Sequence, residues 1–245
     1  MRVQTILFLL LFSTSAFCAP QSNGLPSAEV VIARMLEHNT QRHMQAAGYT
    51  GMRLYALQNG RLHRSAQMLV RVECDANQEK HFTVLSEQGW KSAQRHVLHK
   101  MLEAEAEDSL PDLRLKAELN RNNYEFQMVR TALWADRMEY VLNVVPRRHD
   151  ERLFEGQIWV DAQDYALARA EGHPARNPSF WIRSVHFVQT YQKTGAFWFP
   201  ISTDSVTEVR ILGATTLTIS YFDYAPISLQ ETQSVSAVLQ EGVTQ

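Results

Sequence analysis

Alternation of apolar and polar residues with a period of two runs through the second half of this chain and limits the folds that it can adopt. Met138, Tyr140, Leu142 and Val144 share one face of such a segment, and most residues between them are polar. The pattern recurs between polar or glycine-containing turns over residues 124–224. This spacing is typical of antiparallel strands joined by short hairpins. Together with three strands upstream, it predicts about ten strands.

Helical spacing of apolar residues occurs in two segments outside these strands. The first begins after Ser27, which is suited to cap a helix, and stops at Gly48. Three strands follow, the first two joined at Asn59-Gly60. The spacing is helical again over residues 92–122, where Pro111 separates one helix from a second short helix or ordered loop. The 245 residues, 45% of them hydrophobic, suffice for one large, mainly β (α+β) domain.

The apolar face of such a sheet has two alternative fates. Short helices over a large curved sheet can leave an apolar concavity, which would bind acyl chains or other apolar ligands. The 24 aromatic residues (11 Phe, 8 Tyr and 5 Trp) could instead fill that space, and the pattern favours neither outcome. The residues expected to face inward, and to line a cavity if one exists, are Met52, Leu54, Met68, Val70, Phe126, Met128, Tyr140, Leu142, Leu217 and Ile219 on strands and Leu36 and Leu98 on helices.

The N-terminal segment has the order of features found in a secretory signal peptide. Arg2 precedes an apolar run over residues 6–12, which is too short to span a bilayer, and small residues follow. The alternative is a lipoprotein signal in which Cys18 is acylated, but the bulky Phe17 before it disfavours that reading. Cleavage after Cys18 divides the chain into a signal peptide (1–18), a linker (19–26), a folded domain (27–225) and a loose polar tail (226–245).

Cysteine content and charge exclude several classes of protein. With Cys18 removed, Cys74 is the one cysteine left, so no disulfide can form within the chain. Its place in the same alternation as Met68 and Val70 assigns it to the core, rather than to a nucleophile or an intermolecular bridge. The 26 acidic and 24 basic residues give a net charge of −2, which does not favour binding to nucleic acid.

No motif in the sequence indicates catalysis, a metal or a cofactor. Two histidine pairs occur at short helical spacing, His38 with His43 and His96 with His99, but neither pair has a well-placed third ligand. Solvated helix faces explain both pairs better than a metal site. The sequence contains no G-x-S-x-G turn, no glycine-rich phosphate loop and no C-x-x-C. We therefore expect a protein that is not an enzyme.

Several runs of the second half form a more specific pattern when taken together. They are residues 140–148 (YVLNVVPRR), 153–161 (LFEGQIWVD), 169–175 (RAEGHPA), 178–181 (PSFW), 195–200 (GAFWFP) and 217–221 (LTISY). This pattern resembles the LolA/LolB-like superfamily, and in particular the exported bacterial group of outer-membrane lipoprotein-sorting proteins. The resemblance covers residues 124–224 well and the first half only in its layout of helix, three strands and helical insertion.

The resemblance implies a single open, strongly curved antiparallel half-barrel whose concave face is covered by helices acting as a lid over an apolar cavity. It also implies a periplasmic carrier of lipids or lipoprotein acyl chains, with an inner-membrane release complex or an outer-membrane acceptor as further partners. We expect a monomer. Carriers of this family have a cavity arginine that steadies the lid. Arg53 and Arg130 are candidates for it, but a surface position is the default for both because no family motif surrounds either.

Three functions from different classes remain open on the sequence. The first is a carrier or binder of lipids or lipoprotein acyl chains, used in outer-membrane lipoprotein sorting or other envelope lipid handling. The second is a regulatory or sensor module of the envelope that has a filled core and recognises proteins through its surface. A hydrolase built on a lipocalin-like pocket is the remote third. The volume left empty under the helices decides between the first two hypotheses, because a carrier needs an open cavity and the sensor module has a filled core.

Overall fold

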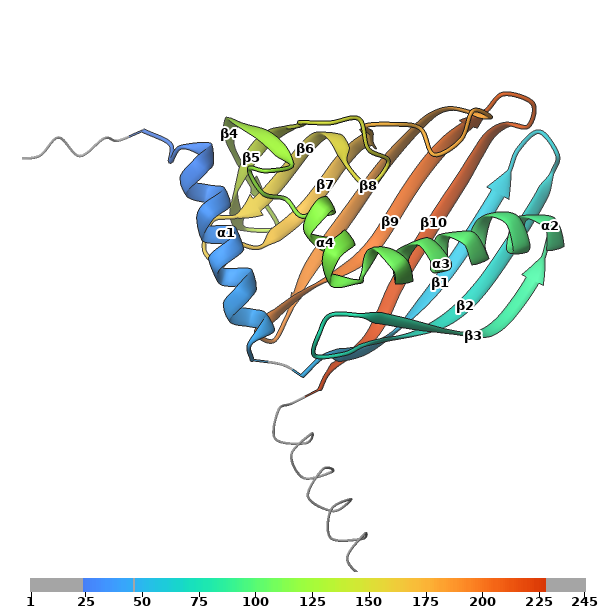
Figure 1. Ribbon diagram of the computed structural model, residues 1–245, viewed down its shortest axis with the longest axis horizontal. Helices are drawn as coiled ribbons and strands as arrows, with labels where there is room; N and C mark the ends of the chain where they lie inside the picture. Colours follow the sequence, from blue (N-terminus) through green and yellow to red (C-terminus); the bar gives the residue numbers. More distant parts are fainter. Residues whose placement is uncertain (1–23, 46, 228–245) are drawn as a thin grey trace, which may run out of the picture.

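The computed structural model describes residues 24–45 and 47–227, so the expected signal peptide and nearly all of the expected tail lie outside the described residues. The elements in chain order are α1 (Ala28–His43), β1 (Tyr49–Asn59), β2 (Arg64–Cys74), β3 (Lys80–Gly89), α2 (Lys91–Ala93), the π-helical turn η1 (Gln94–Leu98), α3 (His99–Asp108), α4 (Pro111–Ala117), β4 (Tyr124–Trp134), β5 (Arg137–Pro146), β6 (Phe154–Asp161), β7 (Leu167–Pro174), β8 (Ile182–Thr194), β9 (Phe197–Val209) and β10 (Gly213–Pro226). Figure 1 shows their arrangement. No helix within these residues is long and apolar enough to cross a membrane.

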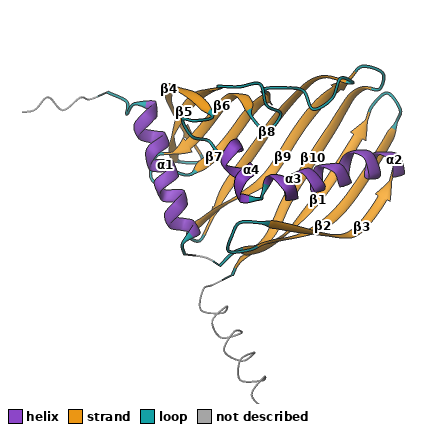
Figure 2. Ribbon diagram, in the orientation of Figure 1, coloured by secondary structure: helices purple, strands orange, loops and turns teal. Residues whose placement is uncertain are grey.

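The ten strands form one antiparallel sheet in the order β3-β2-β1-β10-β9-β8-β7-β6-β5-β4. Strands that are consecutive in sequence pair with each other except β3 and β4, and the one pair that is not consecutive joins β1 to β10 within the described residues. Within the described residues β3 and β4 are the two edges and do not pair with each other, so the sheet is an open half-barrel. The helices lie over one face of the curved sheet (Figure 2). The predicted fold class is therefore confirmed.

Helix α1 crosses the concave face on the side formed by β4 to β7. Its predicted start is confirmed, because the hydroxyl oxygen of Ser27 accepts a hydrogen bond from the backbone N–H of Val30 (3.3 Å). The helix ends at His43, before the expected stop at Gly48. With strands β4 to β7 it buries a first core, which includes Val31, Ile32, Met35, Tyr124, Leu142, Val144, Leu153, Ile158 and Val160.

The second helical segment covers the opposite side of the concave face. Helix α2, the turn η1 and helix α3 are continuous and lie over β1, β2 and β10 (Figure 1). Together they bury a second core, which comprises Tyr55, Leu57, Ala66, Met68, Val70, Ala93, Leu98, Leu102, Leu217 and Ile219. The second short helix expected after Pro111 is confirmed as α4, with Pro111 at its first turn. Helix α1 therefore covers the concave face on the side of β4 to β7, and the second helical segment covers it on the side of β1, β2 and β10.

The expectation that Met52 and Leu54 face inward is wrong. The side chains of Arg53 and Tyr55 point into the concave face, and Tyr55 lies directly opposite the fully buried Met68 of β2. Directly paired residues share a face of a sheet, so Met52 and Leu54 lie on the outer face. The cause is that β1 carries large apolar side chains on both of its faces, so alternation alone does not set its orientation. Its pairing with β2, whose alternation is clear, decides it.

Candidate functional site

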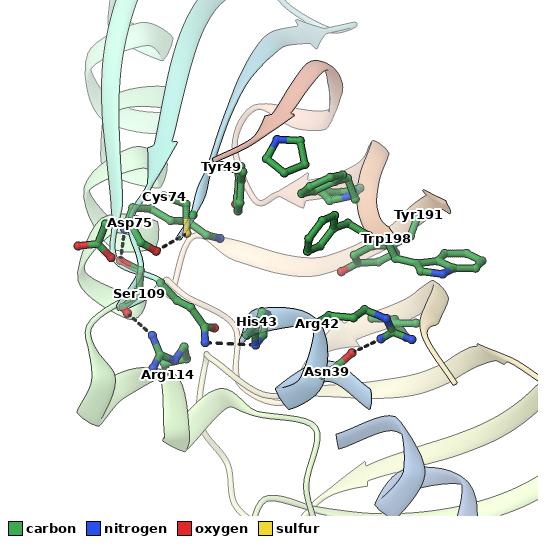
Figure 3. Close-up of a pocket in the computed structure, with 18 of the residues that line it drawn as sticks. Asn39, Arg42, His43, Tyr49, Cys74, Asp75, Ser109, Arg114, Tyr191 and Trp198 are labelled. Carbon is green, nitrogen blue, oxygen red and sulfur yellow. Dashed lines mark hydrogen bonds between the residues drawn. The ribbon is translucent and has the colours of Figure 1, made fainter. Parts of the chain in front are cut away.

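A cavity of about 450 Å³ opens at the end of the sheet where β1 begins and β10 ends (Figure 3). Its wall is formed by the C-terminal end of α1, the β2–β3 turn, the junction of α3 and α4, and parts of β7, β8 and β9. The concave face is therefore packed solid under each helical segment and hollow between the two. Cavities of about 300–1,000 Å³ are usual for small-molecule sites.

One wall of the cavity is aromatic. The rings of Phe199 and Tyr224 stack with a centroid distance of 4.2 Å and an interplanar angle of 8°. Tyr49 meets Phe199 edge-on at 5.3 Å, and Phe197 stacks on it at 6.0 Å. Tyr191 adds a further ring to the lining. Contiguous aromatic surface of this kind suits an apolar chain or a flat apolar group.

The first strand enters this aromatic wall through a close backbone approach. Gly48 has a φ of +131°, and a Cβ atom at this position would lie 2.1 Å from the carbonyl oxygen of Cys74. Only glycine therefore fits here. Cys74 itself is buried and free, as predicted, and burial raises the pKa of its thiol. A thiol kept protonated in this way is a poor nucleophile, so the cavity offers no activated cysteine.

The opposite wall is polar and begins with Arg114 of α4. Its guanidinium Nη1 donates to the carbonyl oxygen of Asn77 in the β2–β3 turn (2.6 Å) and, at 3.4 Å, to that of Ser109. These two bonds link α4 and the end of α3 to the turn. Within the described part of the chain, Arg114 has no carboxylate within ion-pair distance. Its positive charge therefore lies in the cavity wall without a counterion among the described residues.

The C-terminal turn of α1 adds two more basic side chains to this wall. Arg42 donates to the side-chain oxygen of Asn39 (2.7 Å) and to the backbone carbonyl of Asp164. His43 Nδ1 lies 3.2 Å from Nε2 of Gln78 (Figure 3). Burial, together with the positive charges of Arg114 and Arg42, lowers the pKa of His43 below its ordinary value. A negative charge that entered the cavity would act to raise the pKa of His43 again.

The acidic residues that line the cavity already have partners. The carboxylate of Asp75 accepts hydrogen bonds from the backbone N–H groups of Asn77 (2.8 Å) and Glu79 (2.9 Å) within its own turn. Asp108 pairs with Arg152 outside the cavity at 2.6 Å. The polar wall therefore combines hydrogen-bond donors and the positive charges of Arg42 and Arg114 with the carboxylate of Asp75, which forms no ion pair among the described residues.

The cavity is bounded toward the second core by an ionic cluster of three residues, Arg53, Lys80 and Glu105. The Glu105 carboxylate of α3 accepts from Arg53 of β1 and from Lys80 of β3, each at 2.7 Å. Burial acts to raise the pKa of Glu105, but the two cations outweigh it and lower the pKa to about 2. Burial acts to lower the pKa of Lys80, and Glu105 more than compensates, so that pKa is raised. The cluster fastens α3 to two strands.

The default surface position is wrong for Arg53 and correct for Arg130. Arg53 is 2% exposed and lies between the rings of Phe82 and Tyr221, at 5.2 and 5.0 Å from their centroids. Arg130 is exposed on the edge strand β4. Glu105 is the reason that Arg53 can be buried, because an arginine inside a core needs a carboxylate partner. That partner is 52 residues distant in sequence, which no local motif reveals.

None of the twelve residues expected to line a cavity is part of the wall of this one. Five of them belong to the second core and one to the first: Met68, Val70, Leu98, Leu217 and Ile219, and Leu142. Leu36, Phe126, Met128 and Tyr140 are half-buried and pack against the first core, while Met52 and Leu54 lie on the outer face. The structure therefore places most of them in, or packed against, the two cores. Whether any of them contacts a ligand stays a prediction.

The residues of the actual wall carry two signals in the sequence, although neither of them alone locates a cavity. One is the unbroken aromatic run Phe197-Trp198-Phe199, which exceeds what one buried face of a strand needs. The other is Glu105 within the acidic end of α3, where negative charges oppose the helix macrodipole and so require outside partners. The histidine pairs do not meet at a site, and no group of three His, Cys, Asp or Glu suited to a metal occurs among the described residues.

The chain matches the model of a family of unknown function, DUF5686, over residues 117–224, which is less than half of its length. No curated protein matches it. Among solved structures it is similar to a LolA superfamily protein from Nitrosomonas europaea (12% identity, 84% of this chain and 96% of that chain covered, TM-score 0.43). It is also similar to an outer membrane lipoprotein-sorting protein domain from Vibrio parahaemolyticus (11%, 80% and 93%, 0.45).

A third similar structure is the MucA/MucB complex of Pseudomonas aeruginosa, with 10% identity, 82% of this chain and 99% of that chain covered, and a TM-score of 0.27. At these identities and TM-scores the likenesses say nothing about what the chain binds. The resemblance to LolA superfamily proteins that the sequence indicates is found again among solved structures, and there it is a likeness of fold at low sequence identity.

Proposed function

We propose that this protein is a non-catalytic binder and carrier of a lipid or a lipoprotein acyl chain in the periplasm. The observation that carries the proposal is the cavity of about 450 Å³ that remains between two packed cores. A sheet whose concave face were filled throughout would leave only its surface for binding. Here the two helical segments cover opposite sides of that face and leave between them a cavity with one aromatic wall and one polar wall.

The aromatic wall supplies the driving force for taking up an apolar chain. Each methylene group that moves from water to the surface formed by Tyr49, Phe197 and Phe199 contributes about 0.8 kcal/mol. Half a dozen buried methylene groups would thus give several kcal/mol, which is enough to offset the cost of fixing a flexible chain. The wall is rigid, because Phe199 is held between Tyr49 and Tyr224.

The polar wall selects the end group of such a ligand. Arg42 and Arg114 bond to carbonyl or amide oxygens and form no ion pair among the residues that the structure describes. A carboxylate or phosphate beside His43 would be attracted by the positive charges of Arg42 and Arg114, which both act on His43, and would favour the protonated form of His43. We therefore expect an amphiphile whose apolar chain lies on the aromatic wall and whose acidic end group lies near the junction of α1 and α4.

Uptake of a fluorescent fatty acid by the purified protein is the direct test. We expect binding that is displaced by unlabelled fatty acid, and we expect mass spectrometry of organic extracts to detect lipid in the protein as isolated. Replacing Ala76, an exposed residue of the cavity wall, by tryptophan should weaken binding about tenfold or more by occupying the cavity. The matched control is Ala214→Trp, because Ala214 is exposed near the other end of β10.

The end group is tested by comparing a fatty acid with its methyl ester. Arg114→Gln is expected to weaken binding of the acid by about tenfold and to leave the ester nearly unchanged, since a charged hydrogen bond is worth about 1.5–3 kcal/mol. Binding should also become tighter as pH falls through the pKa of His43 while the ligand is still ionised. Absence of any displaceable uptake, together with extracts that contain no lipid, would rule out the carrier function.

A further inference from the structure

Three connections meet at the end of the sheet that lies opposite the cavity. They are the β1–β2 turn, the β7–β8 loop and the β9–β10 turn, seen at the upper edge of the sheet in Figure 1. Each exposes large apolar side chains. The exposed fractions are 40% for Leu62, 76% for Phe180, 55% for Trp181 and 61% for Ile211. We call these four residues the apolar rim.

The apolar rim is held in place by hydrogen bonds rather than exposed through loose loops. The Arg210 backbone N–H donates to the carbonyl oxygen of Trp181, and its Nε donates to that of Phe180, both at 2.9 Å. The Arg210 guanidinium also lies 4.8 Å from the centroid of the Phe180 ring. Arg61 donates to the carbonyl oxygen of Ile211 at 2.9 Å. The three connections therefore form one surface whose backbone is held by hydrogen bonds.

The charge around the apolar rim is mostly positive, with the exposed Glu208 of β9 beside it, opposite Ser184 and Ala214. Residues 60–64, 175–183 and 210–213 contain five arginines and no aspartate or glutamate. One of the five, Arg176, pairs with Glu151. The other four are Arg61, Arg64, Arg183 and Arg210, which are exposed and have no ion-pair partner in the described residues. The chain as a whole is slightly acidic, with a net charge of −2, so this basic end is a local feature.

We propose that the apolar rim docks on an anionic phospholipid bilayer. Aromatic and aliphatic side chains at loop tips can enter the interfacial region of a bilayer, where tryptophan is especially favoured. Unpaired arginines beside them are attracted to anionic head groups. A protein partner of standard size would need a larger complementary surface than four apolar side chains. The combination of few apolar tips and several unpaired arginines favours a lipid surface.

Vesicle flotation of the purified protein tests this proposal. We expect binding to vesicles of phosphatidylcholine with phosphatidylglycerol, little binding to phosphatidylcholine alone, and weakening as salt rises. Phe180→Ser with Ile211→Ser should reduce the affinity by about tenfold. Arg64→Gln with Arg183→Gln should reduce it to a similar extent. Brominated phospholipid should quench tryptophan fluorescence, and Trp181→Phe should remove most of that quenching.

Matched controls come from surfaces away from the rim. Leu133→Ser with Trp134→Ser changes equally exposed residues of the β4–β5 hairpin, at the cavity end of the strands, and Arg71→Gln with Arg130→Gln removes two other exposed charges. Both double variants should leave vesicle binding unchanged. Circular dichroism confirms that each variant is folded.

Three outcomes would overturn the proposal. They are an absence of binding to the anionic vesicles, whether or not the rim binds another protein, equal binding to neutral and anionic vesicles, or full binding by both sets of rim variants. The cavity variant Ala76→Trp should bind vesicles normally, so that a failure of the lipid-carrier function and a failure of rim docking are distinguishable.

Discussion

Replacing Met68 by aspartate is expected to prevent folding. Met68 is fully buried, and its side chain lies in the second core between β1 and the helical segment above it. The change removes buried apolar area and places a carboxylate inside a tightly packed apolar core, which costs free energy even though the buried Arg53 lies diagonally across on β1. The combined cost of more than about 5 kcal/mol is of the same size as the whole stability of a typical domain. Circular dichroism and urea unfolding measure it.

The milder change Met68→Ala tests the same core packing with a loss of stability that is small enough to measure. It should lower the free energy of unfolding by about 2–5 kcal/mol, as expected for a fully buried methionine. Met138→Ala is the control, because Met138 is 46% exposed on β5 and should change stability by no more than about 0.5 kcal/mol. If Met68→Ala bound fatty acid less well but unfolded at the same urea concentration as the parent, Met68 would line a cavity rather than a packed core.

Replacing Glu105 by glutamine is expected to cost about 2–3 kcal/mol at neutral pH. Removal of one partner from a buried ion pair typically costs about 3–5 kcal/mol, because the other charge remains buried. The lower value applies here because the Glu105 side chain is 35% exposed, whereas that of Arg53 is 3% exposed. The change leaves Arg53 in the second core without a counterion and weakens the attachment of α3 to β1 and β3. Urea unfolding at pH 7 measures the loss.

The stability contributed by the ionic cluster should also depend on pH. The folded-state pKa of Glu105 is about 2, below its ordinary value of 4.5. A carboxylate with a lowered pKa stabilises the fold above its unfolded-state pKa, and that contribution is lost as the pH falls. We therefore expect the parent protein to lose about 1–2 kcal/mol from this group between pH 4.5 and 2, after allowance for its solvent exposure.

The matched comparison is the difference between the parent and Glu105→Gln across this pH range. The difference in unfolding free energy should be largest at pH 7 and should shrink toward pH 2, where Glu105 in the parent also becomes neutral. Glu103→Gln on the same helix is the control, because the ion pair of Glu103 among the described residues is with Lys100 and both side chains are more than half exposed. A difference that stayed constant from pH 7 to pH 2 would contradict the role given to the charge of Glu105.

The sheet and its helices could be predicted because strand alternation and helix signals are local. Ser27 caps α1 through a contact three residues away, and Pro111 marks the start of α4 in the same direct way. The orientation of β1 could not be predicted, because Leu54 and Tyr55 are equally plausible as inward residues. Its pairing with Met68 on β2 decided the face. Alternation therefore identifies strands more reliably than it assigns their faces when both faces are apolar.

The candidate site could not be predicted because a cavity lies where packing stops, and periodicity finds only what packs. The residues with the clearest alternation, such as Leu142 and Met68, became the most buried members of the two cores. The wall was instead formed by turns and strand ends that have no periodic signature, including the β2–β3 turn around Asn77. The burial of Arg53 depended on Glu105, and sequence periodicity carries no information about such a distant pair.

The pairing of β1 with β10 has a consequence for how the protein is made. Asn59 and Thr215 lie side by side in the sheet, yet 156 residues separate them in the chain. The first three strands therefore leave the ribosome long before β10, the strand beside which they lie in the described sheet, has been synthesised. Contacts that close such long loops are associated with slow folding and with prolonged exposure of unpaired strand edges. A nascent chain of this architecture would gain from a holding chaperone until translation ends.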